Sequence, residues 1–141
     1  MARTPLGSYR FELASAPGSP RARELWLQHA AGFLLFQDVR GYAIELVDPS
    51  LSEPARAAVV KAIDDAVYGL MMVFDGVSGS LRSLDHRVHL KTTVCLSRRQ
   101  DDREELVEEL DLFHGDGMCM GYHGWLEGDF GEDPVVNGVR K

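Results

Sequence analysis

The pattern of hydrophobic and polar residues begins with a long helical segment. Residues 20–47 carry apolar side chains at helical spacing. Ser19 followed by Pro20 is typical of an N-cap residue with proline in the first turn. One straight helix over this range would be about 42 Å long, which is large for a chain of this size. We therefore expect a kink or break near Gly41.

A second helical pattern follows Asp48 and Pro49. Ser52 is the expected N-cap, because a capping box starting at Ser50 would place Pro54 where a backbone donor is needed. From residue 59 onward one apolar face continues for over three turns, through Ile63, Val67, Leu70, Met71 and Phe74. The short connection between the two helical segments favours an antiparallel helix hairpin.

Three further segments complete the predicted fold. Residues 8–14 and 86–97 alternate apolar and polar side chains with the period of a half-buried strand. A third, short helix is predicted over residues 102–113, because Asp102 and Glu105 form a capping box ahead of an apolar stripe. Together the elements predict an α+β fold in which the helix hairpin packs on a small antiparallel sheet.

Residues 114–131 are rich in glycine, with six of the fourteen glycines of the chain. So much glycine disfavours both helix and strand, although residues 118–122 alternate as a strand would. We expect this Gly-rich C-terminal segment to close one edge of the sheet. The chain is expected to form a single domain over residues 1–141, with loosely ordered ends at 1–7 and 132–141.

The composition argues against a disulfide-rich, secreted or membrane-spanning protein. A chain of 141 residues can bury a core without disulfides, and Cys95 and Cys119 are too few for a disulfide framework. No apolar run resembles a signal peptide or approaches the roughly 18 residues of a membrane span. We therefore expect a cytoplasmic protein that crosses no membrane. Arginine outnumbers lysine by 12 to 3, which points to GC-rich coding and a bacterial source.

The net charge of −7 is distributed unevenly along the chain. Residues 82–100 hold five basic and one acidic residue (+4), whereas residues 101–133 hold one basic and twelve acidic residues (−11). An acidic surface disfavours direct binding of nucleic acid and favours a basic protein partner. The candidate partner-binding residues are Glu104, Glu105, Glu108 and Glu109.

A metal site is the second hypothesis. The Gly-rich segment contains five potential ligands of a divalent metal such as zinc: His114, Asp116, Cys119, His123 and Glu127. Their spacing matches no established metal motif, and His86 and His89 would lie on opposite faces of a strand. A packing role, in which glycines allow close backbone approach, is the favoured alternative. No cofactor is therefore expected.

Two other groups of residues favour a structural interpretation. Asp64 and Asp65 are adjacent on a helix and point about 100° apart, and Lys61 is placed to pair with Asp65. Cys95 lies among basic residues that could lower a thiol pKa, but no nucleophile motif surrounds it. Because no catalytic set is assembled, the sequence favours a role without catalysis.

Three functions are consistent with these patterns. The first is a binding module with an acidic surface, such as an inhibitor or immunity-type partner of a basic protein. The second is a small metal-dependent enzyme. The third is a structural or assembly subunit that uses the helix hairpin and the apolar run 70–74, either as a homodimer or with the run buried in the core.

Overall fold

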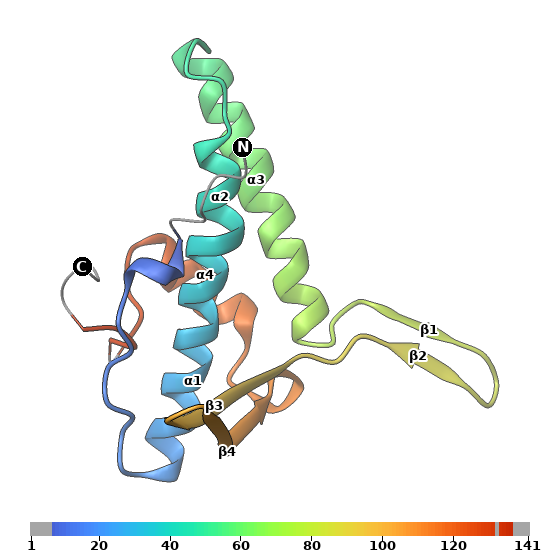
Figure 1. Cartoon of the computed structure of the whole chain (residues 1–141). Helices are drawn as coiled ribbons and strands as arrows, with labels where there is room; N and C mark the ends of the chain where they lie inside the picture. Colours follow the sequence, from blue (N-terminus) through green and yellow to red (C-terminus); the bar gives the residue numbers. More distant parts are fainter. Residues whose placement is uncertain (1–6, 132, 137–141) are drawn as a thin grey trace.

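A computed structural model describes residues 7–131 and 133–136 of the chain (Figure 1). It combines helices with two small antiparallel sheets, which confirms the predicted α+β class. In chain order the elements are η1 Ser8–Arg10, α1 Pro20–Leu35, η2 Phe36–Arg40, α2 Gly41–Glu45, α3 Glu53–Phe74, β1 Ser80–Arg82, β2 Arg87–His89, β3 Thr93–Gln100, β4 Arg103–Asp111, η3 Leu112–His114 and α4 Met118–Leu126.

The first helical segment begins at its predicted cap. The Ser19 hydroxyl accepts a hydrogen bond from the backbone N–H of Ala22 at 3.2 Å, with Pro20 in the first turn. The irregularity expected near Gly41 is a π-helical turn, η2, which directly precedes this glycine. The backbone stays helical from α1 through η2 into α2, so the chain does not break there.

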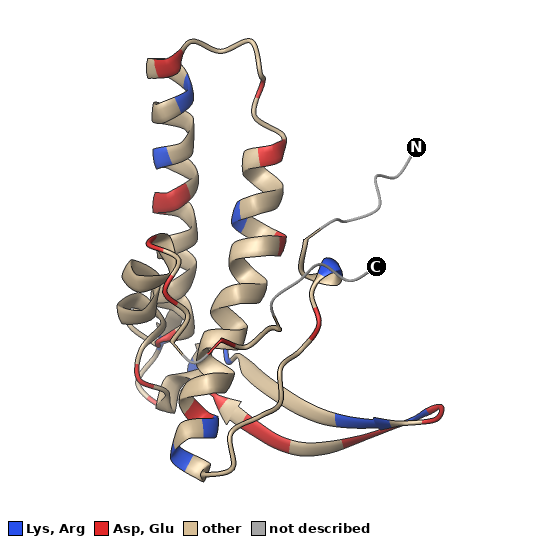
Figure 2. Ribbon diagram, turned by 90° about the vertical axis from the view of Figure 1, so that its left-hand side faces the viewer, with Lys and Arg blue, Asp and Glu red and all other residues tan. Residues whose placement is uncertain are grey.

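Helix α3 runs beside α2 in the opposite direction (Figures 1 and 2). As predicted, the Ser52 hydroxyl accepts from the Ala55 N–H, at 3.4 Å. The C-terminal half of α3 contributes Val67 and Met71 to the core, and Met71 is completely buried. No helix among the described residues is both long and apolar enough to cross a membrane.

The prediction of a third helix over residues 102–113 is wrong. Residues 103–111 form β4, which pairs antiparallel with β3 from Thr93 opposite Asp111 to Gln100 opposite Arg103. The tight turn between the strands has Asp101 at a φ of 55°, a left-handed conformation that aspartate tolerates better than most residues. Pairing with β3 satisfies the backbone that the local capping signal assigned to a helix.

Both strand predictions need correction as well. In residues 8–14 the structure has η1 and a single bridge between Leu13 and Val135 rather than a strand. The expected strand 86–97 is divided into β2 and β3, and β2 pairs with β1 in a separate hairpin. The predicted loose ends lie largely outside the described residues, although the Val136 N–H donates to the Glu12 carbonyl.

The core lies where α4 meets α1 and α3. Trp125 is 2 % exposed and packs against two glycines from different helices. A Cβ atom at Gly32 of α1 or at Gly121 of α4 would lie 2.4 or 2.5 Å from the Trp125 ring. The prediction that the Gly-rich segment disfavours helix is therefore wrong for residues 118–126, which form α4. The lack of a side chain at Gly121, as at Gly32 of α1, leaves room for the indole ring, as the packing interpretation expected.

Candidate functional site

We define the acidic hairpin as residues 93–111. It contains seven of the twelve acidic residues in the block 101–133. It holds three basic and seven acidic residues, for a net charge of −4. Figure 2 shows this hairpin extending from the base of the helices, with acidic residues along one strand and at the turn. Strand β4 is exposed along most of its length, and burial increases only toward Leu110.

The four glutamates proposed for partner binding lie on two faces of this hairpin. Directly paired residues share a face, and successive residues alternate between faces. Glu109 lies opposite Cys95, whereas Glu108 lies opposite Leu96 on the other face. The register shifts at Leu96/Ser97, beyond which Glu105 faces Arg98 and Glu104 faces Arg99. A helix would have gathered the four carboxylates more closely than the strand does.

Burial divides the same glutamates into two classes. Glu108 has a side chain only 24 % exposed and forms a salt bridge with Arg23 of α1. Glu104, Glu105 and Glu109 are exposed and form no salt bridge with any described residue. Glu108 therefore connects the hairpin to α1, and the other three glutamates remain accessible, with Glu104 and Glu109 on one face of the hairpin and Glu105 on the other.

The base of the acidic hairpin is held by further polar contacts. Lys91 Nζ lies 3.2 Å from a carboxylate oxygen of Asp111. The other oxygen of Asp111 accepts from the Phe113 N–H at 3.0 Å, and this bond lowers the pKa of the carboxyl group. Asp111 thus has a structural role, although it belongs to the acidic block of the sequence.

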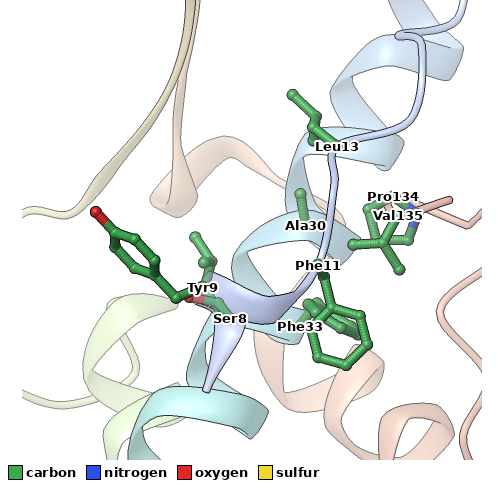
Figure 3. Close-up of a pocket in the computed structure, with 9 residues that line it drawn as sticks. Ser8, Tyr9, Phe11, Leu13, Ala30, Phe33, Pro134 and Val135 are labelled. Carbon is green, nitrogen blue, oxygen red and sulfur yellow. The ribbon is translucent and has the colours of Figure 1, made fainter. Parts of the chain in front are cut away.

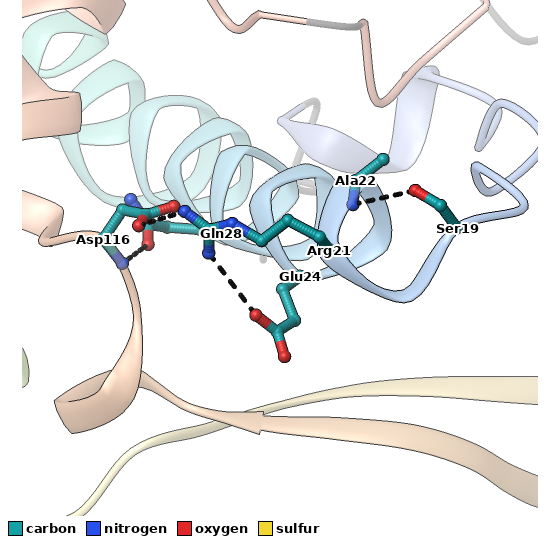
Figure 4. A network of polar contacts seen from close by, with 6 residues as sticks. All are labelled: Ser19, Arg21, Ala22, Glu24, Gln28 and Asp116. Carbon is teal, nitrogen blue, oxygen red and sulfur yellow. Dashed lines mark hydrogen bonds and ion pairs between the residues drawn. The ribbon is translucent and has the colours of Figure 1, made fainter.

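The residues predicted to bind a metal do not converge. Asp116 forms a salt bridge with Arg21 at 2.7 Å (Figure 4), and the ring of His123 lies against that of Tyr68. His114, His123 and Glu127 are exposed at separate positions along the segment. Within residues 7–131 and 133–136, no three His, Cys, Asp or Glu side chains are grouped to hold a metal ion.

Cys119 lies at the first turn of α4 near Asp75. Both oxygens of the Asp75 carboxylate accept from backbone N–H groups there, of Met118 at 2.6 Å and of Cys119 at 2.9 Å. Burial and the neighbouring Asp75 raise the pKa of the Cys119 thiol. Metal ligation and nucleophilic attack both need the thiolate, so this environment disfavours both.

The remaining histidines and the exposed cysteine are spread over other elements. His86 lies in the β1–β2 turn, with Nδ1 2.8 Å from the carboxylate of Asp85. The ring of His89 lies 5.8 Å from that of Phe113. Cys95 is exposed on β3, opposite Glu109.

A polar cluster that the sequence analysis missed connects α4 with α3 and η2. Asp64 accepts from Arg40 Nε at 2.6 Å, while its neighbour Asp65 pairs with Lys61 at 2.6 Å as predicted. The Tyr122 hydroxyl donates to the Asp64 carbonyl at 3.1 Å. Burial raises the pKa of Tyr122 to about 12, so the hydroxyl stays protonated and continues to donate. This cluster positions helices rather than a reacting group.

An apolar groove of about 270 Å³ lies between the N-terminal segment and α1 (Figure 3). Phe11 and Phe33 form one wall, with ring centroids 5.0 Å apart in an edge-to-face arrangement. The complete lining is Ser8, Tyr9, Phe11, Leu13, Ala30, Phe33, Leu34, Pro134 and Val135. Tyr9, Phe11 and Leu13, whose alternation predicted a strand, contribute side chains to this lining.

Comparison of the chain with protein-family models, with curated proteins and with solved structures finds no match.

Proposed function

We propose that this protein is a binding module without catalytic activity that recognises a basic protein through its acidic hairpin. The observation that supports the proposal best is the exposure of Glu104, Glu105 and Glu109 on a hairpin that extends from the helices (Figure 2). An inhibitor or immunity-type role in the cytoplasm suits such a surface, because clustered charge accelerates and steers association with an oppositely charged protein.

Apolar side chains on the same hairpin support this role. Leu106 and Val107 are 53 % and 50 % exposed and lie between the two pairs of glutamates. Protein interfaces combine such apolar contacts with a charged rim, which adds affinity to the electrostatic attraction. A partner with basic residues around an apolar centre would fit this arrangement.

The helices have a supporting role in the proposal. We infer that the antiparallel helix hairpin, together with the Gly-rich C-terminal segment, holds the base of the acidic hairpin in a fixed orientation. The salt bridge between Arg23 and Glu108 and the burial of Leu110 supply that attachment. A fixed base lowers the entropy lost when a partner binds.

The test is binding of a labelled lysine- and arginine-rich peptide, measured by fluorescence anisotropy at low salt. The variant E104Q/E105Q/E109Q should bind about tenfold more weakly, because three exposed ion pairs of about 0.5 kcal/mol each are lost. The variant E24Q/E45Q/E127Q is the control, since it changes the net charge equally at exposed sites elsewhere. Equal weakening in both variants would contradict the proposal.

A further inference from the structure

A second hairpin extends from the body of the protein. We define the basic arm as residues 79–91, which include β1 and β2 (Figure 1). Every residue of this arm is exposed, and Leu84 at its turn is completely exposed. The arm holds three basic residues, Arg82, Arg87 and Lys91, and one acidic residue, Asp85.

The two faces of the arm differ in chemistry. Leu81 lies directly opposite Val88, so these two side chains share one face. Their exposed fractions are 75 % and 68 %. Arg82 lies directly opposite Arg87 on the other face. The arm therefore presents an apolar face and a basic face, and neither is covered by described residues.

Leaving both faces of the arm exposed to solvent is unfavourable for the stability of a single molecule. A hairpin of two strands is only marginally stable in water unless another element packs on it. Like charges directly opposite each other across a hairpin are destabilising, and Arg82 and Arg87 form no salt bridge with any described residue. An acidic surface packed on the basic face would support the hairpin and offset the repulsion between Arg82 and Arg87.

The acidic hairpin offers such a surface. Its net charge is −4, against +2 for the arm, and one charge of each belongs to the Lys91–Asp111 pair within one molecule. The two hairpins of one molecule extend in different directions: the arm projects to the right in Figure 1, and the acidic hairpin does so in Figure 2, after a quarter turn. Opposite charges on two separate projections are suited to contact between molecules.

We propose that the basic arm of one molecule binds the acidic hairpin of a second copy, and that the second copy's arm binds the first molecule in return. The two identical contacts form a closed, two-fold symmetric dimer. Arg82 and Arg87, on the basic face of the arm, meet the carboxylates of β4. This inference rests on the proposed function in that it names a second copy as a partner of the acidic hairpin.

Charge reversal tests this dimer by sedimentation velocity. The unmodified protein should sediment with twice the mass of one chain, with dissociation favoured by added salt. The variants R82E/R87E and E104K/E109K should each be monomeric, because each places like charges in both contacts. An equimolar mixture of the two should recover the dimer, since both contacts then join opposite charges. The control R10E/R56E should remain dimeric.

Two results would overturn the inference. One is an unmodified protein that stays monomeric up to its highest soluble concentration. The other is a mixture of the reversed variants that stays monomeric while both variants retain the circular dichroism of the unmodified protein.

The peptide assay separates this inference from the proposed function. The monomeric variant R82E/R87E keeps the acidic hairpin intact, so it should bind the basic peptide at least as tightly as the dimer does. Peptide binding by a protein that never dimerises overturns only the second copy as partner. Failure of R82E/R87E to bind the peptide, with the mixture still dimeric, overturns only the proposed function.

Discussion

Helix α4 buries three large apolar side chains in the core, whereas the basic arm exposes its own. Met118, Tyr122 and Trp125 of α4 are each at most 2 % exposed, whereas Leu81, Leu84 and Val88 of the arm are at least 68 % exposed. The helix is flanked by α1 and α3, and the arm extends beyond every described element (Figure 1). The difference separates residues that stabilise the fold from residues that are available to a partner.

The two regions therefore respond differently to substitution. Replacing a buried side chain of α4 removes contacts on every side and leaves a cavity. Replacing a side chain of the arm changes little in a single molecule, but it changes a surface that we assign to binding. Stability measurements and association measurements should consequently identify different residues.

The largest expected effect is that of Trp125→Ala. The substitution empties the space between Gly32 and Gly121 and removes the Nε1 donor to His29, so the free energy of unfolding should fall by about 3–5 kcal/mol. Urea denaturation followed by circular dichroism measures the change. Met120→Ala on the same helix is the control, because Met120 is 76 % exposed, and it should change stability by less than about 0.5 kcal/mol. Equal effects would mean that α4 is not buried as described.

Gln28→Leu should have the next largest effect. The buried Gln28 side chain accepts from the Asp116 N–H at 2.6 Å and donates to the Gly117 carbonyl at 3.2 Å. Leucine leaves both backbone groups without these partners, at a cost of about 1–3 kcal/mol by urea denaturation. Arg21→Ala removes an exposed contact to the same loop (Figure 4) and should cost at most about 1 kcal/mol. A larger loss for Arg21→Ala would reverse this ranking.

The free energy of unfolding should depend on pH through the protonation of His29. Burial lowers its pKa from the ordinary value of 6.5, and its Nδ1 accepts from Trp125 Nε1 at 2.9 Å. The unfolded chain therefore binds a proton before the folded chain does as the pH falls. This contribution to stability is complete above pH 6.5, declines below it and levels off once folded His29 is protonated.

Urea titrations between pH 7.5 and 5 would measure this decline. In His29→Gln the part of the slope that begins near pH 6.5 should disappear, whereas His123→Gln, at an exposed position, should leave it unchanged. An unchanged slope in His29→Gln would contradict the assignment.

The smallest expected effect on the stability of a single molecule is that of Leu81→Ser in the arm. The side chain is 75 % exposed, so in the monomeric R82E/R87E background the free energy of unfolding should change by less than about 0.5 kcal/mol. Val67→Ser, at a position 4 % exposed in α3, should cost several times more. A large loss for Leu81→Ser in this background would show that the arm packs on its own molecule.

Locally determined features of the fold could be predicted from the sequence. The caps at Ser19 and Ser52 depend on neighbouring residues, and both were found as expected. The capping box at Asp102 was equally clear, but a neighbouring strand overrode it, since residues 103–111 form a strand that pairs with β3 on both sides of a register shift. Contacts across the chain, such as Gly32 with Trp125, leave no local pattern that spacing could reveal.

The sequence predicted where along the chain the acidic surface lies, but not which glutamates are accessible on it. The sequence located an acidic block at residues 101–133, and the structure places seven of its twelve acidic residues on the acidic hairpin. Because the residues form a strand, Glu108 faces α1 and pairs with Arg23, while Glu109 faces outward. The basic arm was not recognised, because its alternation of apolar and basic residues resembles an ordinary half-buried strand.

Hydrogen exchange as a function of protein concentration tests most directly whether the two hairpins are binding surfaces and not parts of the core. Amides of α1 and α4 should exchange slowly at every concentration. Amides of the basic arm should exchange rapidly in dilute protein, become protected as the concentration rises, and stay unprotected in R82E/R87E. Arm amides that are as protected as those of α4 in the most dilute sample, or that show no protection at any concentration, would contradict this account.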